Sequence, residues 1–338
     1  MGQQFPSDDF PSSYSQVVDG HYYYLREDGS GNYTVYRDKG KKAASFSIPG
    51  GCRVKNFVKS GDRFYAFLEG PYTEEMKNTL VSIDEKTGEV TVVKDMKTYG
   101  VWRLSRASIY HDMLFYREES IKASLSTMVC MAGTYLNEEP EKKYFSPSSH
   151  LADAEEGTES FELLSAIDGK LYYGGVQGKT VTLYSYDLET DEEKELLSFQ
   201  SSVSREAWGW RYVKIDKDYI YFADYIIPRS GGKITRAGAG GFSFNGQYIF
   251  YLDEKRKVHR LSRDLKEDAV VCGDIDAVKV DCTENGIYVQ EYKKTMDLDL
   301  YDQIDQITQA EKWYCRSNSL YYMDFDGKDR KRLWKERD

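Results

Sequence analysis

SLYYMDFDGKDRKRLW, residues Ser319–Trp334, joins an aromatic strand to a basic strand through a tight turn. The turn is Asp326-Gly327, and dipeptides of this kind close β-hairpins because they tolerate positive φ. The flanking segments alternate in side-chain character, which is typical of half-buried strands. The stretch therefore predicts a β-hairpin, and its weaker copies along the whole chain predict a repeat protein.

The clearest repeated signal is a polar turn followed by a pair of apolar or aromatic residues. Seven pairs occur: Tyr22-Tyr23, Phe64-Tyr65, Leu114-Phe115, Leu171-Tyr172, Ile220-Tyr221, Ile249-Phe250 and Ile287-Tyr288. The intervals between their second members are 42, 50, 57, 49, 29 and 38 residues. Alternating segments that run into a polar turn follow most copies, as in Leu80–Asp84, Leu183–Asp187 and Val258–Leu261. Each copy therefore predicts a meander of about four antiparallel strands, too small to bury its own faces.

Radial stacking of such meanders buries both faces of every sheet, so the repeat predicts an all-β fold, a β-propeller. We expect seven blades, with six as the alternative. The count depends on the short, glycine-rich interval between Tyr221 and Phe250, where one blade is expected to have lost or shortened its outer strand. A β-sandwich, or two smaller β-domains, is the competing architecture.

The repeat also predicts the domain organisation. Residues 13–338 are expected to form a single β-propeller domain, because no linker rich in Pro, Gly or Ser interrupts the repeat. Residues 1–12 are expected to be a disordered lead-in or tether. An insertion at residues 291–312 is expected to contain a short helix, since Met296, Leu300, Ile304 and Ile307 recur at helical spacing.

Two tetrads and the opening hairpin resemble a known group of propellers. Tyr321-Tyr322-Met323-Asp324, Tyr221-Phe222-Ala223-Asp224 and Leu320–Leu333 are similar to the YWTD-type repeats of lipoprotein-receptor ectodomains. The resemblance is closer to their bacterial relatives of unknown function, the DUF5050-like propellers. It covers nearly the whole chain and implies a fold rather than an activity. No copy has the tryptophan of the YWTD tetrad, and the apparent count of seven differs from the six blades of the receptor domains. Receptor-like ligand binding is therefore not implied.

Composition limits the partners. The formal net charge is −10 and no long basic run occurs, so nucleic acid is not an expected partner. No apolar run is long enough to predict a transmembrane segment, and we expect a monomer. The five cysteines, at positions 52, 130, 272, 282 and 315, lack CxxC spacing, which argues against a disulfide framework or a zinc site. Cys272 and Cys282 could face each other across adjacent strands, but two reduced core thiols are expected.

The N-terminal segment leaves the compartment open. No secretory signal pattern is found, and Pro6 stands where a myristoylation motif needs Ser or Thr. Phe5–Ser15 has the composition of a frayed terminus, or of a tether that follows an upstream signal or lipid anchor. With such a signal the protein would be exported or on the cell surface of a bacterium, and otherwise it would be cytoplasmic.

One face of the expected propeller is the candidate binding site. The loop that enters each first strand and the loop between second and third strands emerge on one face, which ligands commonly use. Nine residues are expected there: Arg53, Trp102, Arg103, Trp208, Trp210, Arg211, Tyr225, Arg229 and Trp313. Aromatic platforms beside guanidinium groups suit an anionic or sugar-containing ligand. The alternative is that the arginines pair with acidic loops while the tryptophans wedge between blades.

Signals for catalysis are weak. The four histidines, at positions 21, 111, 150 and 259, are scattered, and no HExxH, GxSxG, P-loop or dinucleotide fingerprint is present. The aspartates at 297, 299, 302 and 305 lack the spacing and glycine of an EF-hand. No metal and no cofactor is therefore expected.

The sequence thus favours a non-enzymatic binding or scaffold propeller that recognises a protein, a peptide or a glycan at this face. The alternative is a carbohydrate-active hydrolase or lyase, in which two carboxylates would face each other across the central channel at about 5–10 Å. A structural spacer within a larger assembly is the third possibility.

Overall fold

The computed structural model describes residues 3–4, 15–28, 30–48, 52–69, 77–97, 108–110, 113–121, 127–135, 143–145, 159–177, 180–200, 214–222, 224–237, 240–292 and 317–335. Within these ranges every regular element is a strand. None of these segments forms a helix long and apolar enough to cross a membrane. The helix expected at residues 291–312 falls, beyond its first two residues, outside the described residues.

The described strands form seven antiparallel sheets, six of them with four strands and one with five. In the first half they are β1 (Gln3–Gln4), β2 (Ser15–Val18), β3 (His21–Glu27), β4 (Asn32–Arg37), β5 (Lys41–Ser47), β6 (Arg53–Ser60), β7 (Arg63–Glu69), β8 (Lys77–Asp84), β9 (Val90–Lys97), β10 (Ser108–Tyr110), β11 (Met113–Ile121), β12 (Thr127–Tyr135) and β13 (Lys143–Phe145). They continue with β14 (Glu159–Ile167), β15 (Lys170–Gln177), β16 (Thr180–Asp187), β17 (Glu193–Gln200), β18 (Lys214–Ile215), β19 (Tyr219–Phe222), β20 (Tyr225–Pro228) and β21 (Thr235–Arg236). The last are β22 (Gly240–Phe244), β23 (Tyr248–Leu252), β24 (Val258–Ser262), β25 (Asp268–Cys272), β26 (Ala277–Thr283), β27 (Gly286–Tyr292), β28 (Ser317–Met323) and β29 (Lys331–Lys335).

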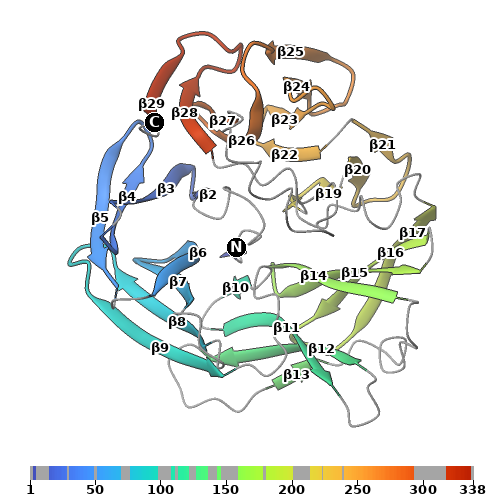
Figure 1. Cartoon of the computed structure of the whole chain (residues 1–338). Coiled ribbons are helices and arrows are strands. Elements are labelled where there is room, and N and C mark those ends of the chain that lie inside the picture. Colours follow the sequence, from blue (N-terminus) through green and yellow to red (C-terminus); the bar gives the residue numbers. More distant parts are fainter. Residues whose placement is uncertain are drawn as a thin grey trace, which may run out of the picture. The chain divides into compact units, whose positions relative to one another are not determined.

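Every four-stranded sheet is a meander of consecutive strands: β2–β5, β6–β9, β14–β17, β18–β21, β22–β25 and β26–β29 (Figure 1). The five-stranded sheet adds β1 to the edge of the meander β10–β13. Repetition of one such meander along a chain is the architecture of a β-propeller, and this all-β protein has that fold. The fold class expected from the repeat is confirmed.

The chain divides into two compact units. The first comprises residues 1–8, 25–36 and 42–213, and the second comprises residues 9–24, 37–41 and 214–338. Residues 3–4 of the expected lead-in form β1, which pairs with β10, and residues 5–14 lie outside the described residues. A single domain over residues 13–338 stays a prediction.

The paired residues that define the repeat occupy the second strand of every sheet: β3, β7, β11, β15, β19, β23 and β27. All fourteen side chains are buried, with at most 9% of any residue exposed. Both members of each pair are buried although they point to opposite faces, because each second strand is covered on both faces. A run of two apolar residues after a polar turn is therefore a reliable marker of this strand.

The polar residue at the end of many strands fixes the hairpin that follows. Oδ1 of Asp84 accepts hydrogen bonds from the backbone N–H groups of Lys86 and Thr87 at 2.9 and 2.8 Å. Asp187 binds the N–H groups of the two equivalent residues of its own turn, and Asp324 does the same for Asp326 and Lys328. These side chains satisfy turn donors that the strand ladder leaves unpaired.

The short interval between Tyr221 and Phe250 is explained by short strands. Residues 214–236 still form a complete sheet, β18–β21, which is separate from β22–β25. Its outermost strand, β21, is only two residues long. The shortened outer strand expected from the glycine-rich interval is therefore present as β21.

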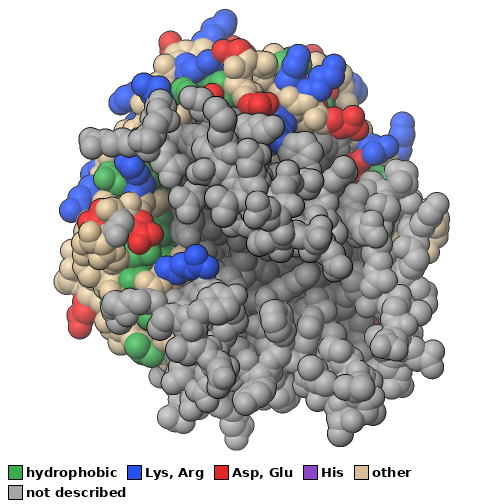
Figure 2. Space-filling view, in the orientation of Figure 1, with side chains coloured by type: hydrophobic (Ala, Val, Ile, Leu, Met, Phe, Trp, Pro, Cys, Tyr) green, Lys and Arg blue, Asp and Glu red, His purple; other side chains and the backbone are tan. Residues whose placement is uncertain are grey.

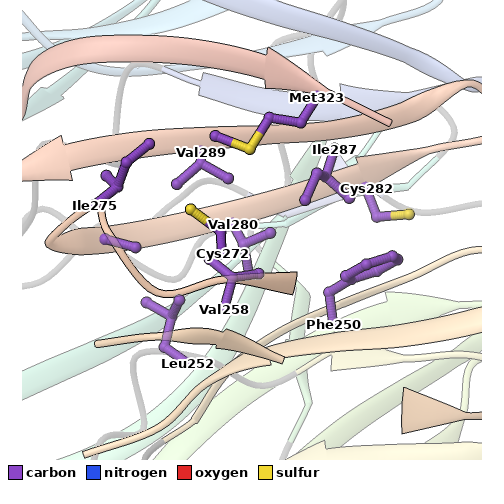
Figure 3. Packing of buried hydrophobic residues seen from close by; sticks show 11 residues of the cluster. Phe250, Leu252, Val258, Cys272, Ile275, Val280, Cys282, Ile287, Val289 and Met323 are labelled. Atoms are coloured by element: carbon purple, nitrogen blue, oxygen red, sulfur yellow. The ribbon is translucent and has the colours of Figure 1, made fainter. Parts of the chain in front are cut away.

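Part of the core of the second unit lies between sheets β22–β25 and β26–β29 (Figure 3). Phe250 and Val258 of one sheet pack there with Val280, Ile287 and Met323 of the other. The free thiols of Cys272 and Cys282 belong to the same cluster. They lie on strands of different sheets and so do not face each other across paired strands, and burial raises the pKa of both. Reduced core thiols, as expected, are what the structure contains at these two positions.

Candidate functional site

Six of the nine residues expected at the binding face lie outside the described residues: Trp102, Arg103, Trp208, Trp210, Arg211 and Trp313. Of the remaining three, Arg53 belongs to the first compact unit, whereas Tyr225 and Arg229 belong to the second. The clustering of all nine therefore stays a prediction.

Two of the three described residues have the expected places within their sheets. Arg53 is the first residue of the first strand β6 and is exposed. Tyr225 begins the third strand β20 directly after the connection from β19, but it is buried, with 7% of the residue exposed. Its ring is therefore part of the packed interior of the second unit.

The expected position of Arg229 was wrong. The connection between the second and third strands is only residues 223–224, so the chain has already returned along β20 before it reaches Arg229. The backbone N–H of Arg229 donates to the carbonyl of Asp218 at 2.9 Å, and its guanidinium donates to the carbonyl of Asp216 at 2.8 Å. Both acceptors lie between β18 and β19, at the opposite end of the sheet from Tyr225.

The described residues of the second unit contain a different polar site, which we call the first-strand cluster. It comprises Ser15, Tyr22, Lys214, Lys279, Asp281 and Gln290. Ser15, Lys214 and the Lys279–Asp281 pair come from β2, β18 and β26, the first strands of three sheets. Tyr22 and Gln290 come from the neighbouring second strands β3 and β27.

Strand alternation explains why β26 carries charges in a buried place. Val280 and Cys282 point toward the hydrophobic core shared with β22–β25 (Figure 3). Lys279 and Asp281 have the other parity and therefore point to the opposite face of the strand. That face carries the hydrogen bonds to Ser15, so β26 has one apolar and one polar face.

The cluster is held by short contacts. Nζ of Lys279 donates to the carbonyl oxygen and to Oγ of Ser15 at 2.8 and 2.9 Å, and it lies 2.9 Å from Oδ2 of Asp281. Nε2 of Gln290 donates to Oγ of Ser15 at 2.6 Å and to the Tyr22 hydroxyl at 3.2 Å. The Tyr22 ring stacks on Tyr288 with centroids 4.1 Å apart. Nζ of Lys214 lies 3.6 Å from Oδ1 of Asp281.

Burial sets the protonation of the cluster. It is the main cause that lowers the pKa of Lys279; Asp281 counteracts this effect and Lys214 adds to it. Burial, followed by the charge of Asp281, raises the pKa of Tyr22 well above its usual value, so that its hydroxyl stays protonated. The two ammonium groups share one carboxylate, which leaves these described residues with a surplus of positive charge whenever both lysines are protonated.

Lys214 and Asp281 occupy equivalent register positions in their sheets. Lys214 pairs with Tyr221, and Asp281 pairs with Tyr288, and both tyrosines are the second member of their repeat pair. The corresponding first-strand residues of the other sheets are Gln16, Val58, Ser108, Ser165 and Ser243. Lys214 and Asp281 are thus the charged residues at this position, they have opposite signs, and their side chains meet.

The first-strand cluster was not predicted from the sequence, although the sequence contains a signal for it. Each of these first-strand residues stands seven positions before the second member of its repeat pair. A charged residue at that position, as in the segment AVKVDCT at 277–283, alternates with apolar neighbours on a strand that is covered on both sides. Burying a charge in such a strand costs free energy unless the charge is paired. A charged residue at this position therefore indicates a polar site inside the sheet packing.

Other charged residues of the second unit connect neighbouring sheets. Arg263, in the β24–β25 turn, donates to Asp216 at 2.6 Å, to the Tyr221 hydroxyl at 2.8 Å and to Asp218 at 2.9 Å. Burial disfavours the charged form of Asp216, but hydrogen bonds from Arg263 and from a backbone N–H outweigh it and hold the pKa of Asp216 below its usual value. Arg330 binds Asp274 in the same inter-sheet manner, with two bonds of 2.7 and 2.8 Å. These contacts have a structural role.

No metal site is formed by the residues that the structure describes, where no group of three or more His, Cys, Asp and Glu side chains converges. His259 lies 3.0 Å from Asp268 and 3.4 Å from Asp253, and it stacks on Tyr251. His21 lies 2.8 Å from Asp38. Both described histidines are therefore paired within their own sheets.

The repeated four-stranded meanders define the protein as a β-propeller. No protein-family model matches the chain, and no curated protein sequence matches it. Among solved structures, a prolyl endopeptidase is similar with a TM-score of 0.61 and 12% identity, over 95% of this chain and 49% of that one. BamB from Moraxella catarrhalis is similar with a TM-score of 0.42 and 14% identity, over 80% and 78% of the two chains. TolB from Acinetobacter baumannii has a TM-score of 0.40 and 13% identity, over 79% and 62%. At such identities the likeness shows the fold alone, and this chain spans about half of the prolyl endopeptidase.

Proposed function

We propose that this protein is a non-enzymatic binding or scaffold β-propeller that recognises a protein, a peptide or a glycan. The observation that carries the proposal is the contact between Lys214 and Asp281, the charged residues at the register-equivalent position of the first strands. First strands line the channel of a propeller, and its mouth is where ligands of this fold commonly bind.

The charged groups around Asp281 suit the binding of a charged ligand. The groups at ion-pair distance from Asp281 among the described residues are two lysines. Other described aspartates, such as Asp84, Asp187 and Asp324, are engaged in hairpin turns.

The sequence near Lys214 supports the same face. Arg211 and Trp210 stand three and four residues before Lys214, in the segment that enters β18. An arginine and a tryptophan beside an inner-strand lysine would combine stacking with charge-assisted hydrogen bonds.

The test is a glycan array and a peptide array probed with the wild-type chain and with the Trp210→Ala/Arg211→Ala variant. We expect binding to particular array members, its loss in the double variant, and an unchanged melting temperature. Arg332→Ala, on the exposed outer strand β29, is the matched control and should bind like the wild type. A large fall in the melting temperature of the double variant, or no binding by the wild type, would contradict the proposal.

A further inference from the structure

The two lysines of the first-strand cluster differ in their exposure and in the contacts of their ammonium groups. Lys279 is largely buried, with 13% of its side chain exposed, and its ammonium donates to two oxygen atoms of Ser15 besides facing Asp281. Lys214 keeps 39% of its side chain exposed. Its contact with Asp281, at 3.6 Å, is the interaction that its ammonium makes with the described residues. Among the described residues, Lys214 therefore keeps donors that no other contact occupies, at the exposed edge of a buried charge cluster.

The positive charge of the two lysines favours an anionic ligand. The Asp281 carboxylate, with 3% of its side chain exposed, already faces the ammonium of Lys279 at 2.9 Å. When both lysines are protonated, a second carboxylate at Lys214 would give these described residues two ammonium and two carboxylate groups. Such a contact is a charge-assisted hydrogen bond, which is stronger than a neutral one.

The two described aromatic rings of the cluster offer no platform for a sugar. Sugars commonly need an accessible ring face as a platform. The Tyr22 and Tyr288 rings stack on each other and both residues are buried, so neither offers that face. A peptide carboxylate needs only the ammonium donors that Lys214 presents.

We propose that Lys214 is the anion-binding group of a subsite for a carboxylate of an acidic peptide. This inference rests on the proposed binding function and adds the ligand chemistry. The Lys279–Asp281 pair holds the subsite in place, and Lys214 makes the contact. Because the whole chain carries a net charge of −10, an acidic peptide is repelled by much of the protein, so binding that depends on one lysine is diagnostic.

The experiment measures binding of a labelled hexaglutamate peptide by fluorescence anisotropy at low and physiological salt. Lys214→Met should weaken binding about tenfold or more, the loss expected for one charge-assisted hydrogen bond. Lys214→Arg should retain most of the affinity. Lys217→Met is the matched control: this exposed lysine stands three residues further on, in the turn after β18, and its loss should leave the affinity unchanged. Circular dichroism should show the same melting temperature for all three variants.

The outcomes separate this inference from the proposed function. No hexaglutamate binding by the wild type, or equal losses in Lys214→Met and Lys217→Met, would overturn the inference. Binding of oligogalacturonate instead of hexaglutamate, with the same dependence on Lys214, would overturn the peptide assignment. Array ligands that bind the Lys214→Met variant normally would leave the binding function intact and remove Lys214 from it. An array without any ligand would remove both.

Discussion

Gly327 sits directly on the backbone carbonyl of Val271, so closely that a Cβ atom at Gly327 would overlap the oxygen. Gly327 belongs to the β28–β29 turn, and Val271 to β25, the outermost strand of the preceding sheet. Gly88, in the β8–β9 turn, has the same relation to the carbonyl of Ser45 in β5. In both places a hairpin of one sheet therefore packs its glycine against the edge strand of the sheet before it.

Replacement of Gly88 or Gly327 by alanine should destabilise the protein. Both residues have positive φ, 73° and 74°, which costs a non-glycine residue about 1–2 kcal/mol. The overlap with a backbone carbonyl adds about 1–3 kcal/mol, because backbone cannot rotate away as a side chain can. We expect the free energy of unfolding, measured by urea titration, to fall by about 2–5 kcal/mol in each variant.

Gly61→Ala is the matched control for the two glycine variants. Gly61 also has positive φ, 59°, but a Cβ there would meet nothing within 4 Å. Its loss should be limited to the conformational cost of about 1–2 kcal/mol. Equal losses at Gly61, Gly88 and Gly327 would contradict close packing between hairpin and edge strand.

Arg263 should be the most important charged residue of the β24–β25 turn. Its guanidinium connects Asp216, Asp218 and the Tyr221 hydroxyl, and its side chain is only 18% exposed. Arg263→Ala would leave the largely buried carboxylate of Asp216 without its cation. We expect the free energy of unfolding to fall by about 2–4 kcal/mol.

Lys266→Ala tests whether burial of the ion pair causes the loss of stability expected for Arg263→Ala. Lys266 pairs with Asp264 in the same turn at 3.1 Å, but its side chain is 78% exposed. Removal of such an exposed pair should change the free energy of unfolding by less than about 1 kcal/mol. Comparable effects of the two substitutions would show that the Arg263 network is no more stabilising than a surface ion pair.

The Arg330–Asp274 pair should contribute to stability in a pH-dependent way. Two hydrogen bonds from Arg330 are the main cause that lowers the pKa of Asp274 to about 2. In the unfolded chain an aspartate titrates near pH ~3.9. Because the folded pKa is the lower one, the contribution is complete above that value and is lost as the pH falls toward 2.

The measurement compares Arg330→Gln with the wild type by urea unfolding from pH 7 down to pH 3. The stability difference should be small, below about 1 kcal/mol, since the pair is largely exposed, and it should shrink below about pH 4. Arg332→Gln, on the exposed face of β29, should show no such trend. A difference that stays constant or grows toward pH 3 would refute the assignment of the shift to Arg330.

Local sequence determined much of the fold. The buried pairs mark the second strand of each sheet because two apolar residues after a polar turn can be satisfied only on a strand covered on both faces. The two tetrads show the limit of such local reasoning. Tyr221–Asp224 ends the second strand β19, whereas Tyr321–Asp324 ends the third strand β28, so they are not equivalent copies. An aromatic strand end followed by aspartate can precede either the β19–β20 hairpin or the β28–β29 hairpin.

The residue type in the turn between the third and fourth strands of a sheet also depends on the neighbouring sheet. Leu265 has positive φ, 62°, and its N–H donates to the carbonyl three residues earlier, as the N–H of Gly327 does. The sheet before it ends in the two-residue strand β21, and Leu265 packs with Ala237 against a shared core cluster. A short edge strand leaves room for a side chain at this turn position. The sequence alone could not reveal this, because the length of β21 and the identity of residue 265 are related only through packing.

The candidate site was predictable only in part for the same reason. Lys214 and Asp281 are 67 positions apart in the chain and meet through strands of different sheets. The seven-residue offset from the repeat pairs identifies them as equivalent positions, but their contact depends on tertiary structure. The tryptophans and arginines expected at the binding face depend on loops, whose course local patterns do not define.

The buried pair Lys279–Asp281 allows a sharp test of the cluster. Lys279→Met removes the ammonium that lies 2.9 Å from Asp281. Of the described cations, it leaves Lys214, at 3.6 Å, to face a carboxylate with 3% exposure. Removal of one partner of a buried ion pair typically costs about 3–5 kcal/mol, and we expect the free energy of unfolding to fall by that amount. The Lys279→Met/Asp281→Leu variant removes both charges and keeps the apolar volume. Since replacing a whole buried pair is often neutral, the double variant should recover most of the loss, giving a large coupling energy in a double-mutant cycle by urea unfolding. If the losses of Lys279→Met alone and of Asp281→Leu alone instead add up to the loss of the double variant, the two side chains do not form a coupled pair. In that case the first-strand cluster lacks the support that holds Lys214 in place.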